Sequence, residues 1–197
     1  DIGAWSFCQD KIMTTGGEGG MITTNSKKLW SVIWSYKDHG KSWGTVYQKE
    51  QLPGYKWLHE SFGTNWRITE IQAAIGRIQL KRMELWNRQR TENAQAILEL
   101  ARQYCSVFRA PQVPDYMKHA WYKCYFFVRS DGLKDDWSRD RIIDEILLRG
   151  VPCYSGSCSE VYLEKAFDRT PFRPIGRLPT AKELGESALM FMVHPTL

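Results

Sequence analysis

The sequence predicts a mixed α/β protein, because strand patterns and helix patterns alternate along the chain. Two short strand patterns, at residues 4–8 and 21–24, flank a glycine-rich turn and are followed by a helical pattern. The longest helical pattern begins near residue 68. An aromatic strand pattern at residues 121–129 precedes a further helical pattern. A strand followed by a helix is therefore expected in both halves of the chain.

The composition excludes a disordered or low-complexity chain. Of the 197 residues, 43% are hydrophobic and 13% aromatic, which is enough to form a core. The longest apolar run, residues 188–193, is far shorter than the roughly 20 residues that cross a bilayer, and no signal-peptide pattern opens the chain. Five scattered cysteines favour a reduced protein, and no CxxC or histidine pair completes a metal site. We therefore expect a soluble, cytoplasmic protein without a membrane segment or a bound metal.

The first 40 positions predict two strands and a helix. Residues 16–20 (GGEGG) form a tight connection between the two strand patterns. Ser26 lies where a helix N-cap is expected, and apolar residues recur at helical spacing up to Tyr36. Gly40 is placed to end that helix. Because the chain starts in a strand pattern without a Met, we expect it to begin inside a domain.

The middle of the chain predicts an irregular segment and then the strongest helix. Residues 41–65 contain five aromatic residues, which favour a functional loop over a disordered one. Thr69 to Gln72 form a capping-box pattern, and the apolar residues that follow keep three- and four-residue steps to about Tyr104. A helix of about 35 residues spans about 50 Å, so we expect it to connect two lobes.

The C-terminal part predicts shorter elements. We expect an aromatic strand, a helix, a short helix, a further helix and a last strand at residues 121–129, 138–150, 161–167, 180–189 and 191–193. A serine at the start and a glycine at the end delimit the first of these helices. A second capping-box pattern opens the last helix. No internal repeat is present.

Lys11 is the first candidate catalytic residue. It follows the first strand pattern and precedes the glycines, so its amine projects from a loop where the backbone can approach a ligand closely. A lysine forms a Schiff base with a carbonyl when its amine is partly neutral, which burial or a neighbouring cofactor can arrange. Taken alone, such a lysine is more often only a solvated loop residue.

The surroundings of Lys11 change that assessment. Ser6 and Phe7 precede it, and residues 17–20 (GEGG) follow it. This arrangement resembles the DegT/DnrJ/EryC1/StrS family of sugar aminotransferases, in which a Ser-Phe pair, a lysine five residues after the serine and a Gly-(Asp/Glu)-Gly-Gly turn surround pyridoxal phosphate. Residues 63–74 resemble, independently, the family's Gly-x-Asn-aromatic-Arg segment before a long helix. With weaker matches further on, the resemblance covers most of the chain.

The resemblance implies roles for individual residues. Lys11 forms the Schiff base with pyridoxal phosphate and, once displaced, moves a proton between the α-carbon of the amino donor and C4′ of the cofactor. Ser6 donates its hydroxyl to the cofactor phosphate, and Asn65 reaches the phosphate bound by the neighbouring subunit, so that a homodimer shares its active site. Arg67 holds a carboxylate or phosphate oxygen. His39, beside the irregular segment, is a further candidate for substrate contact.

The implied fold is that of the fold-type I pyridoxal-phosphate transferases, like aspartate aminotransferase, represented by its C-terminal portion. Residues 1–67 then end the large domain, residues 68–104 form an interdomain helix and residues 105–197 form the small α/β domain. The implied reaction moves an amino group from an amino acid, with glutamate as the expected donor, to a keto group of a nucleotide-linked sugar, for a cell-surface polysaccharide or an antibiotic. Related dehydratases carry histidine in place of the Schiff-base lysine, so Lys11 favours the transaminase.

Two departures from the family pattern matter. Cys8 stands where the family often has histidine, and nothing in the sequence corresponds to the family's N-terminal half, which supplies the remaining cofactor contacts. The chain is therefore expected to be part of a longer protein. Two alternatives stay open: a catalytically incomplete subdomain, and a non-enzymatic phosphate- or nucleotide-binding module with a net charge of +5. The glycines lack a P-loop ending and no basic face carries stacking rings, so no nucleic-acid partner is expected.

Overall fold

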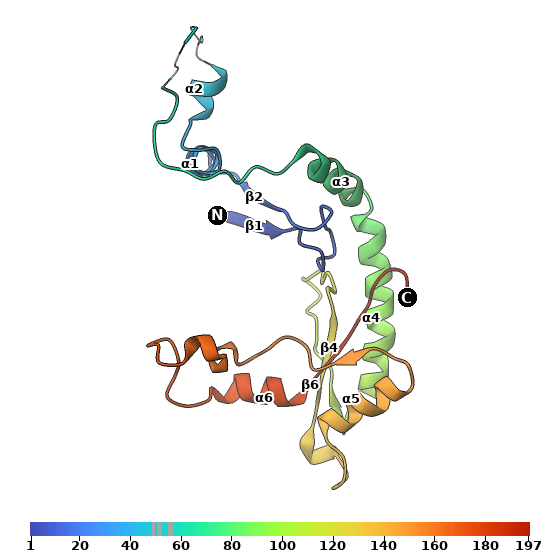
Figure 1. Cartoon of the computed structure of the whole chain (residues 1–197). Coiled ribbons are helices and arrows are strands. Elements are labelled where there is room, and N and C mark those ends of the chain that lie inside the picture. The colour runs from blue at the N-terminus through green and yellow to red at the C-terminus, as the bar shows by residue number, and fades with distance from the viewer. Residues whose placement is uncertain (49, 51–52, 55–56) are drawn as a thin grey trace. The chain divides into compact units, whose positions relative to one another are not determined.

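A computed structural model describes residues 1–48, 50, 53–54 and 57–197. Tyr55, one of the aromatic residues of the predicted irregular segment, lies outside the described residues. The chain divides into two compact units, Asp1–Met83 and Glu84–Leu197, and both combine helices with strands as the sequence predicts (Figure 1). The three-part division into large domain, interdomain helix and small domain stays a prediction. None of the helices in the described part has the length and apolar character needed to cross a membrane.

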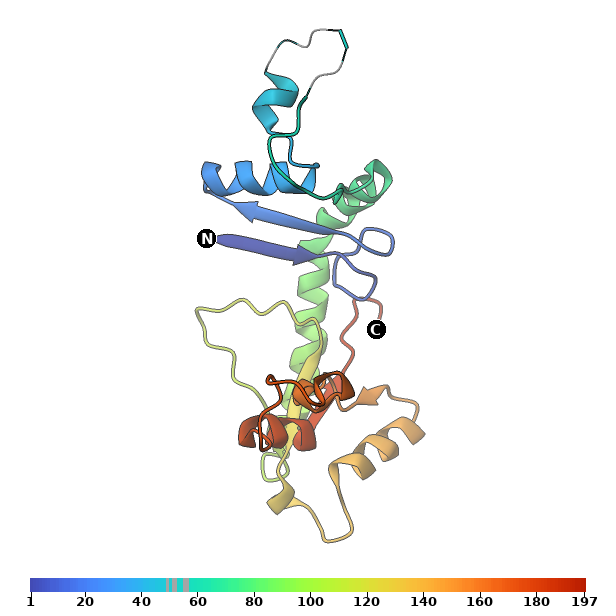
Figure 2. The same cartoon turned by 60° about the vertical axis from the view of Figure 1, so that its left-hand side comes forward.

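The first unit is built on a pair of antiparallel strands. β1 (Ile2–Ser6) pairs with β2 (Gly20–Thr24), and α1 (Lys27–Lys37) runs beside them (Figure 2). The hydroxyl of Ser26 accepts a backbone hydrogen bond from the first turn of α1, so the predicted N-cap is confirmed. The first strand lies two residues earlier than the predicted 4–8, because a turn begins at the eighth residue.

The predicted irregular segment contains a short helix, α2 (Trp43–Tyr47). Ser42 caps it by accepting a backbone hydrogen bond from its first turn. Trp43 packs edge to face on Trp34 of α1, with ring centroids 5.3 Å apart, and lies 4.2 Å from the ring of Tyr47. Trp43 and Tyr47 thus attach α2 to α1, whereas Phe62 of the same segment is 99% exposed. The local pattern does not reveal this tertiary contact.

Two helices replace the single long helix that the sequence predicts: α3 (Glu70–Leu80) and α4 (Met83–Gln103). The capping box is confirmed, since the side chains of Thr69 and Gln72 bond reciprocally to each other's backbone amides. Helix α3 ends where the amide of Arg82 donates to the carbonyl of Gln79, three residues back, which tightens its last turn. Neither glycine nor proline marks this break in the sequence.

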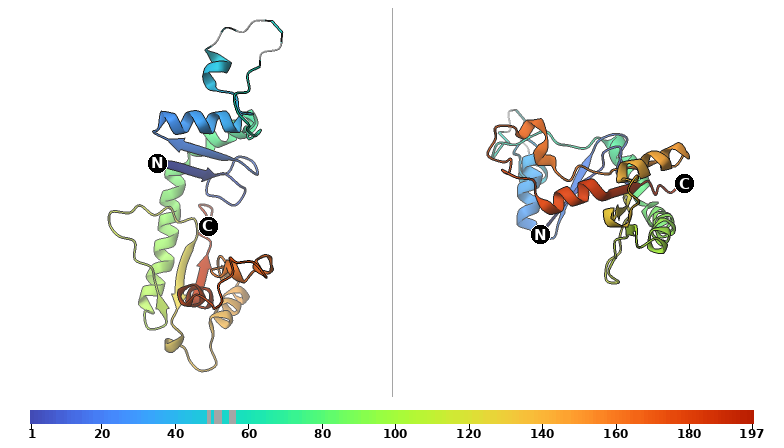
Figure 3. Two further views of the ribbon diagram at one scale, coloured as in Figure 1. Left: turned by 90° about the vertical axis from the view of Figure 1, so that its left-hand side faces the viewer. Right: turned by 90° about the horizontal axis from the view of Figure 1, so that it is seen from below.

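The second unit contains a four-stranded antiparallel sheet. Its strands, β3 (Phe108–Arg109), β4 (Cys124–Val128), β5 (Cys153–Tyr154) and β6 (Ala188–Phe191), follow the order β3-β4-β6-β5. Its helices after α4 are α5 (Arg139–Leu148) and α6 (Pro179–Ser187), with single 3-10 turns at Ser130–Gly132, Val161–Leu163 and Lys165–Phe167. β4 and β6 lie side by side at the centre (Figure 3).

One face of this sheet packs on α4 and α5. Alternate residues of β4 are buried, as expected for a strand whose one face meets a core. The buried residues that form this core are Ala94, Leu98, Ala101, Trp121, Cys124, Phe126, Val128, Ile142, Cys153, Leu189, Phe191 and Val193. The strand predicted at residues 121–129 is therefore present in the shorter range Cys124–Val128, and the serine-capped helix after it is confirmed.

The predictions for the end of the chain are wrong in detail. The second capping box is absent, because α6 begins one residue earlier with Pro179 in its first turn and has no side-chain cap. The chain then enters β6 directly, so that residues 188–189, expected in a helix, lie in a fully buried strand. The short helix expected at 161–167 consists of two 3-10 turns. β3 and β5, each of two residues, were not expected as strands.

The core of the second unit provides a stability test. Leu98 of α4 is 1% exposed, whereas Leu100 on the same helix is 54% exposed. We expect Leu98→Ala to lower the free energy of unfolding by about 2–5 kcal/mol, because a buried cavity remains. Leu100→Ala should change it by less than about 0.5 kcal/mol. Urea unfolding followed by circular dichroism measures both; equal losses would contradict this core.

Candidate active site

Residues 7–19, which we call the lysine loop, connect β1 to β2. Hydrogen bonds close the base of this loop. The amide of Phe7 donates to the carbonyl of Gly19 at 2.8 Å. The carbonyl of Phe7 accepts from the amide of Thr15 at 3.2 Å and from the hydroxyl of Thr14 at 3.1 Å. The two ends of the loop are therefore held together directly after β1.

Lys11 and Ser6 lie at the start of this loop, and both are exposed. The amide of Lys11 donates to the carbonyl of Cys8 at 3.1 Å, which closes a tight turn. Ser6 ends β1 opposite Gly20, the last glycine of the predicted turn. The structure thus gathers an amine, a hydroxyl and the glycine-rich segment at one end of the strand pair.

The glycine-rich segment needs glycine for two different reasons. Gly17 has a φ of 131°, a backbone conformation that side-chain-bearing residues rarely adopt. At Gly19 a Cβ atom would collide with the hydroxyl of Thr15, which is itself 1% exposed and donates to the carbonyl of Glu18 at 2.9 Å. The glycine-rich segment therefore bends where a turn was predicted, and its backbone packs closely on its own loop.

Helix α3 contacts the lysine loop through two glutamines that are not among the predicted site residues. The side-chain oxygen of Gln79 accepts a hydrogen bond from the amide of Thr14 at 2.9 Å. The side-chain nitrogen of Gln72 donates to the carbonyl of Glu18 at 2.6 Å. A spacing of seven residues places both side chains on one face of a helix, and this is the signal that would have found them.

Asn65 belongs to a second group, at the C-terminal end of α1. Asp38 and Asn65 form a short antiparallel bridge. The carbonyls of the last turn of α1 accept hydrogen bonds from the segment around Asn65: Tyr36 from the amide of Thr64 at 2.6 Å, and Lys37 from the amide of Trp66 at 3.0 Å. Carbonyls at a helix end have no partner within the helix, so this segment satisfies them. The side chain of Asn65 is left exposed.

Arg67 and His39 adjoin the same helix end. The guanidinium of Arg67 forms an ion pair with the carboxylate of Asp38, while 45% of the Arg67 side chain stays exposed. Burial raises the pKa of the Asp38 carboxyl, but the hydrogen bond from Arg67 and nearby positive charges lower it more, so its pKa lies below the ordinary 3.8. His39 has a φ of 61° and its ring lies 6.4 Å from that of His59. Asp38 was not expected as part of the site.

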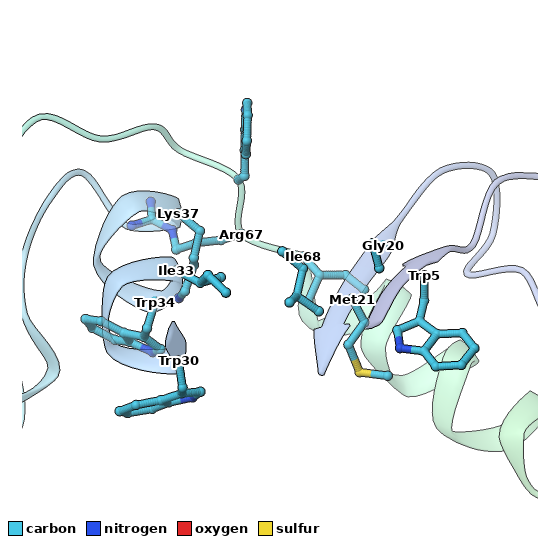
Figure 4. A pocket seen from close by; sticks show the side chains of 12 residues that line it. Trp5, Gly20, Met21, Trp30, Ile33, Trp34, Lys37, Arg67 and Ile68 are labelled. Atoms are coloured by element: carbon cyan, nitrogen blue, oxygen red, sulfur yellow. The ribbon is translucent and has the colours of Figure 1, made fainter. Parts of the chain in front are cut away.

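A cavity of about 630 Å³ lies between α1 and the strand pair (Figure 4). Trp30 and Trp34 line it from α1 and Met21 from β2, so its walls are largely apolar. Lys37 and Arg67 supply its charged groups. Of the predicted site residues in the described part of the chain, only Arg67 lines this cavity, so it is not the predicted cofactor site.

Comparisons with known proteins agree with the motifs. The model of the DegT/DnrJ/EryC1/StrS aminotransferase family matches residues 1–197. An aminotransferase structure from Psychrobacter cryohalolentis is 61% identical, with a TM-score of 0.95 over 100% of this chain and 51% of that chain. The erythromycin biosynthesis sensory transduction protein EryC1 of Saccharopolyspora erythraea is 26% identical over 98% of this chain and 47% of its own length. The chain thus spans about half the length of the relatives it matches.

A structure with the predicted cofactor bound is among those that share this fold. A GDP-4-keto-6-deoxy-D-mannose-3-dehydratase of E. coli with bound hydrated pyridoxal phosphate shares the fold, with a TM-score of 0.78 at 18% identity over 98% of this chain and 50% of that chain. Pyridoxal phosphate is thus the cofactor bound in that dehydratase, as the resemblance implies for this chain. The residues at the lysine loop fit it chemically, because Lys11 offers an amine for its aldehyde and Ser6 offers a donor for its phosphate.

The ion pair beside Asn65 predicts an acid-dependent stability. Because the pKa of Asp38 is lowered on folding, the pair stabilises the protein above the pKa of an unfolded aspartate, and this is lost as the pH falls through the lower folded pKa. We expect Asp38→Asn to lower the free energy of unfolding at pH 7 by about 1 kcal/mol, since Arg67 is partly solvated.

The check is urea unfolding of wild type and Asp38→Asn at pH 7 and at pH 2.5. The difference between the two proteins should shrink at the lower pH. Asp144→Asn, which removes an exposed carboxylate of α5 and the same charge, is the control and should leave unfolding unchanged at both values. An Asp38→Asn difference that is as large at pH 2.5 as at pH 7 would refute a stabilising charge pair.

Proposed function

Because the chain belongs to the DegT/DnrJ/EryC1/StrS aminotransferase family, we propose that it carries the lysine-bearing part of a pyridoxal-phosphate-dependent sugar aminotransferase. The proposed reaction transfers an amino group from an amino acid, with glutamate as donor, to a keto group of a nucleotide-linked sugar. The observation that carries this proposal is Lys11 itself, presented on a closed loop beside Ser6 and the glycine-rich segment. The 61% identical aminotransferase supports amine transfer as the reaction class.

Lys11 has two proposed roles at one atom. Its Nζ would hold the cofactor by condensing with the aldehyde carbon, with loss of water, and so would anchor the cofactor at the loop. Once an amino donor had displaced it, the freed Lys11 amine would accept the proton of the donor's α-carbon and later return a proton. Pyridoxal phosphate, when bound, supplies the electron sink that makes this carbon acidic. Ser6 is proposed to hold the phosphate by donating its hydroxyl, which fixes the cofactor at a second point.

Asn65 is proposed to act in the active site of a partner subunit. Its side chain is exposed, while hydrogen bonds to α1 hold the backbone on either side of it. An amide that is held rigidly and left open to solvent suits a contact with a phosphate group of another molecule. The proposed assembly is therefore a homodimer in which each subunit completes the other's cofactor site.

Arg67 and His39 are proposed to contact the substrate. The exposed part of the Arg67 guanidinium keeps donors for a carboxylate or phosphate oxygen, although Asp38 already occupies part of it. Asp38 then orients this side chain rather than binding substrate itself. Lys11 favours amine transfer over the dehydration carried out by other members of this fold. We also propose a reducing, cytoplasmic location, because the five cysteines are free.

The first experiment tests Lys11. Pyridoxal phosphate added to the purified chain should produce an absorbance band that borohydride converts into a stable adduct, and peptide mapping should place that adduct on Lys11. Lys11→Ala and Lys11→Arg should both abolish it, since neither provides a primary amine there. Lys28→Ala, which removes an exposed lysine of α1, is the control and should keep it.

Each outcome of that experiment is informative. An adduct that is indifferent to Lys11 would overturn the aminotransferase proposal. If this chain gives no adduct but a polypeptide as long as its relatives gives one on Lys11, the chain is a catalytically incomplete part of the enzyme. If neither gives an adduct, a non-enzymatic binding module becomes the better account.

The shared site predicts complementation between two defective chains. Asn65→Ala should weaken cofactor binding, so that little Lys11 is labelled by borohydride at limiting pyridoxal phosphate. An excess of Lys11→Ala chains, which cannot be labelled themselves, should restore the labelling, because mixed dimers combine an intact Lys11 with an intact Asn65 from the other subunit. Chains that carry both substitutions are the control and should restore nothing. Labelling that ignores the added chain would exclude a role for Asn65 between subunits.

A further inference from the structure

We propose that Gln72 and Gln79 are positioning residues that clamp the lysine loop to α3 and thereby hold Lys11 in place for the cofactor. The inference rests on the proposed role of Lys11. Neither glutamine needs to touch the cofactor, since both act on the backbone of the loop. The geometry points to them because they supply hydrogen bonds between this loop and an element more than fifty residues away in the chain.

The two contacts bracket the segment that follows Lys11. Gln79 accepts from the amide of Thr14, and Gln72 donates to the carbonyl of Glu18. The stretch between these contacts contains Gly16 and Gly17, whose φ values of 81° and 131° suit glycine alone. The clamp therefore holds both ends of the part of the loop that has the largest backbone freedom.

The backbone of α3 comes close enough for this clamp because Gly76 lies between the two glutamines. Gly76 is buried, and a Cβ atom there would lie 3.0 Å from the side-chain methyl of Thr15. Thr15 is 1% exposed, so the loop is seated against the helix at this point. Glycine in a helix interior costs about 1 kcal/mol relative to alanine. A close approach of the loop gives this costly residue a structural reason.

The orientation of each glutamine amide follows from its partner. A backbone amide only donates, so Gln79 must use its oxygen toward Thr14, and a carbonyl only accepts, so Gln72 must use its nitrogen toward Glu18. The oxygen of Gln72 meanwhile accepts from the amide of Thr69 at 3.1 Å, which is the capping box. The Gln72 side chain thus caps the start of α3 with its oxygen and holds the loop with its nitrogen.

This asymmetry allows a test in which one chemical change has opposite outcomes. In Gln79→Glu the carboxylate still accepts from the amide of Thr14, so the clamp is kept. In Gln72→Glu the carboxylate still completes the capping box and suits the helix N-terminus, but it faces the carbonyl of Glu18 with an acceptor. Both variants gain the same charge at pH 7, which makes each the control for the other.

The first measurement is hydrogen–deuterium exchange of residues 12–19 in the full chain. We expect Gln72→Glu to exchange about fivefold faster or more in this segment, because a hydrogen bond is lost and a repulsion gained. Gln79→Glu should exchange like wild type, and Gln79→Leu should exchange faster at Thr14. Urea unfolding of Gln72→Glu should shift only slightly from wild type, since the helix cap is retained and one hydrogen bond is lost.

The second measurement is the rate at which pyridoxal phosphate and borohydride label Lys11. Labelling should fall about fivefold in Gln72→Glu and Gln79→Leu, in proportion to the loop opening, and should be rescued in Gln79→Glu. If the two glutamines only stabilised the fold, labelling of Lys11 would fall only as far as the urea midpoint of unfolding falls. Such a parallel fall would overturn the positioning role.

The remaining outcomes separate the two proposals. Equal exchange of residues 12–19 in wild type, Gln72→Glu and Gln79→Glu would overturn the clamp, whatever the labelling shows. If exchange follows the predicted asymmetry but wild type never labels Lys11, the clamp on the loop stands and the proposed function of Lys11 fails.

Discussion

The candidate site depends on how the lysine loop is held, because a loop does not order itself. Fixing the backbone of one residue costs roughly 1–2 kcal/mol of conformational entropy, while a typical hydrogen bond contributes about 1 kcal/mol net. The loop therefore needs several contacts acting together. Its base is closed on Phe7, its glycines pack on the buried Thr15, and Gln72 and Gln79 tie its far end to α3. The position of Lys11 is a consequence of this set of contacts.

The second group of site residues follows from a different constraint, the unsatisfied carbonyls at the end of α1. The segment around Asn65 donates to these carbonyls, and the pair of Asp38 and Arg67 adds a charge interaction next to them. Both groups are thus held by a helix, Lys11 by α3 and Asn65 by α1. Lys11 and Asn65 stay exposed while the hydrogen bonds that hold their segments reach the backbone of those segments.

Much of the fold was predictable where a local rule acts alone. The caps at Ser26, Ser138 and Thr69 each depend on a side chain and an amide a few residues away, and all three are confirmed. The break between α3 and α4 carries no glycine or proline, and β3 and β5 have only two residues each, too few for a pattern. At the end of the chain, pairing of β6 with β4 overrides the helical pattern that runs to Leu189.

The same distinction applies to the site. Ser6, Lys11 and Asn65 are predicted from motif spacing, whereas Asp38, Gln72 and Gln79 contact partners far along the chain. At Gln72 the local pattern correctly predicts the capping box but not the contact with the lysine loop. As a capping-box residue it needs only its oxygen, so a glutamate would serve the helix equally well. Its nitrogen has a use only because the loop lies against α3. The choice of an amide over a carboxylate at this position is therefore explained by the lysine loop and not by the helix.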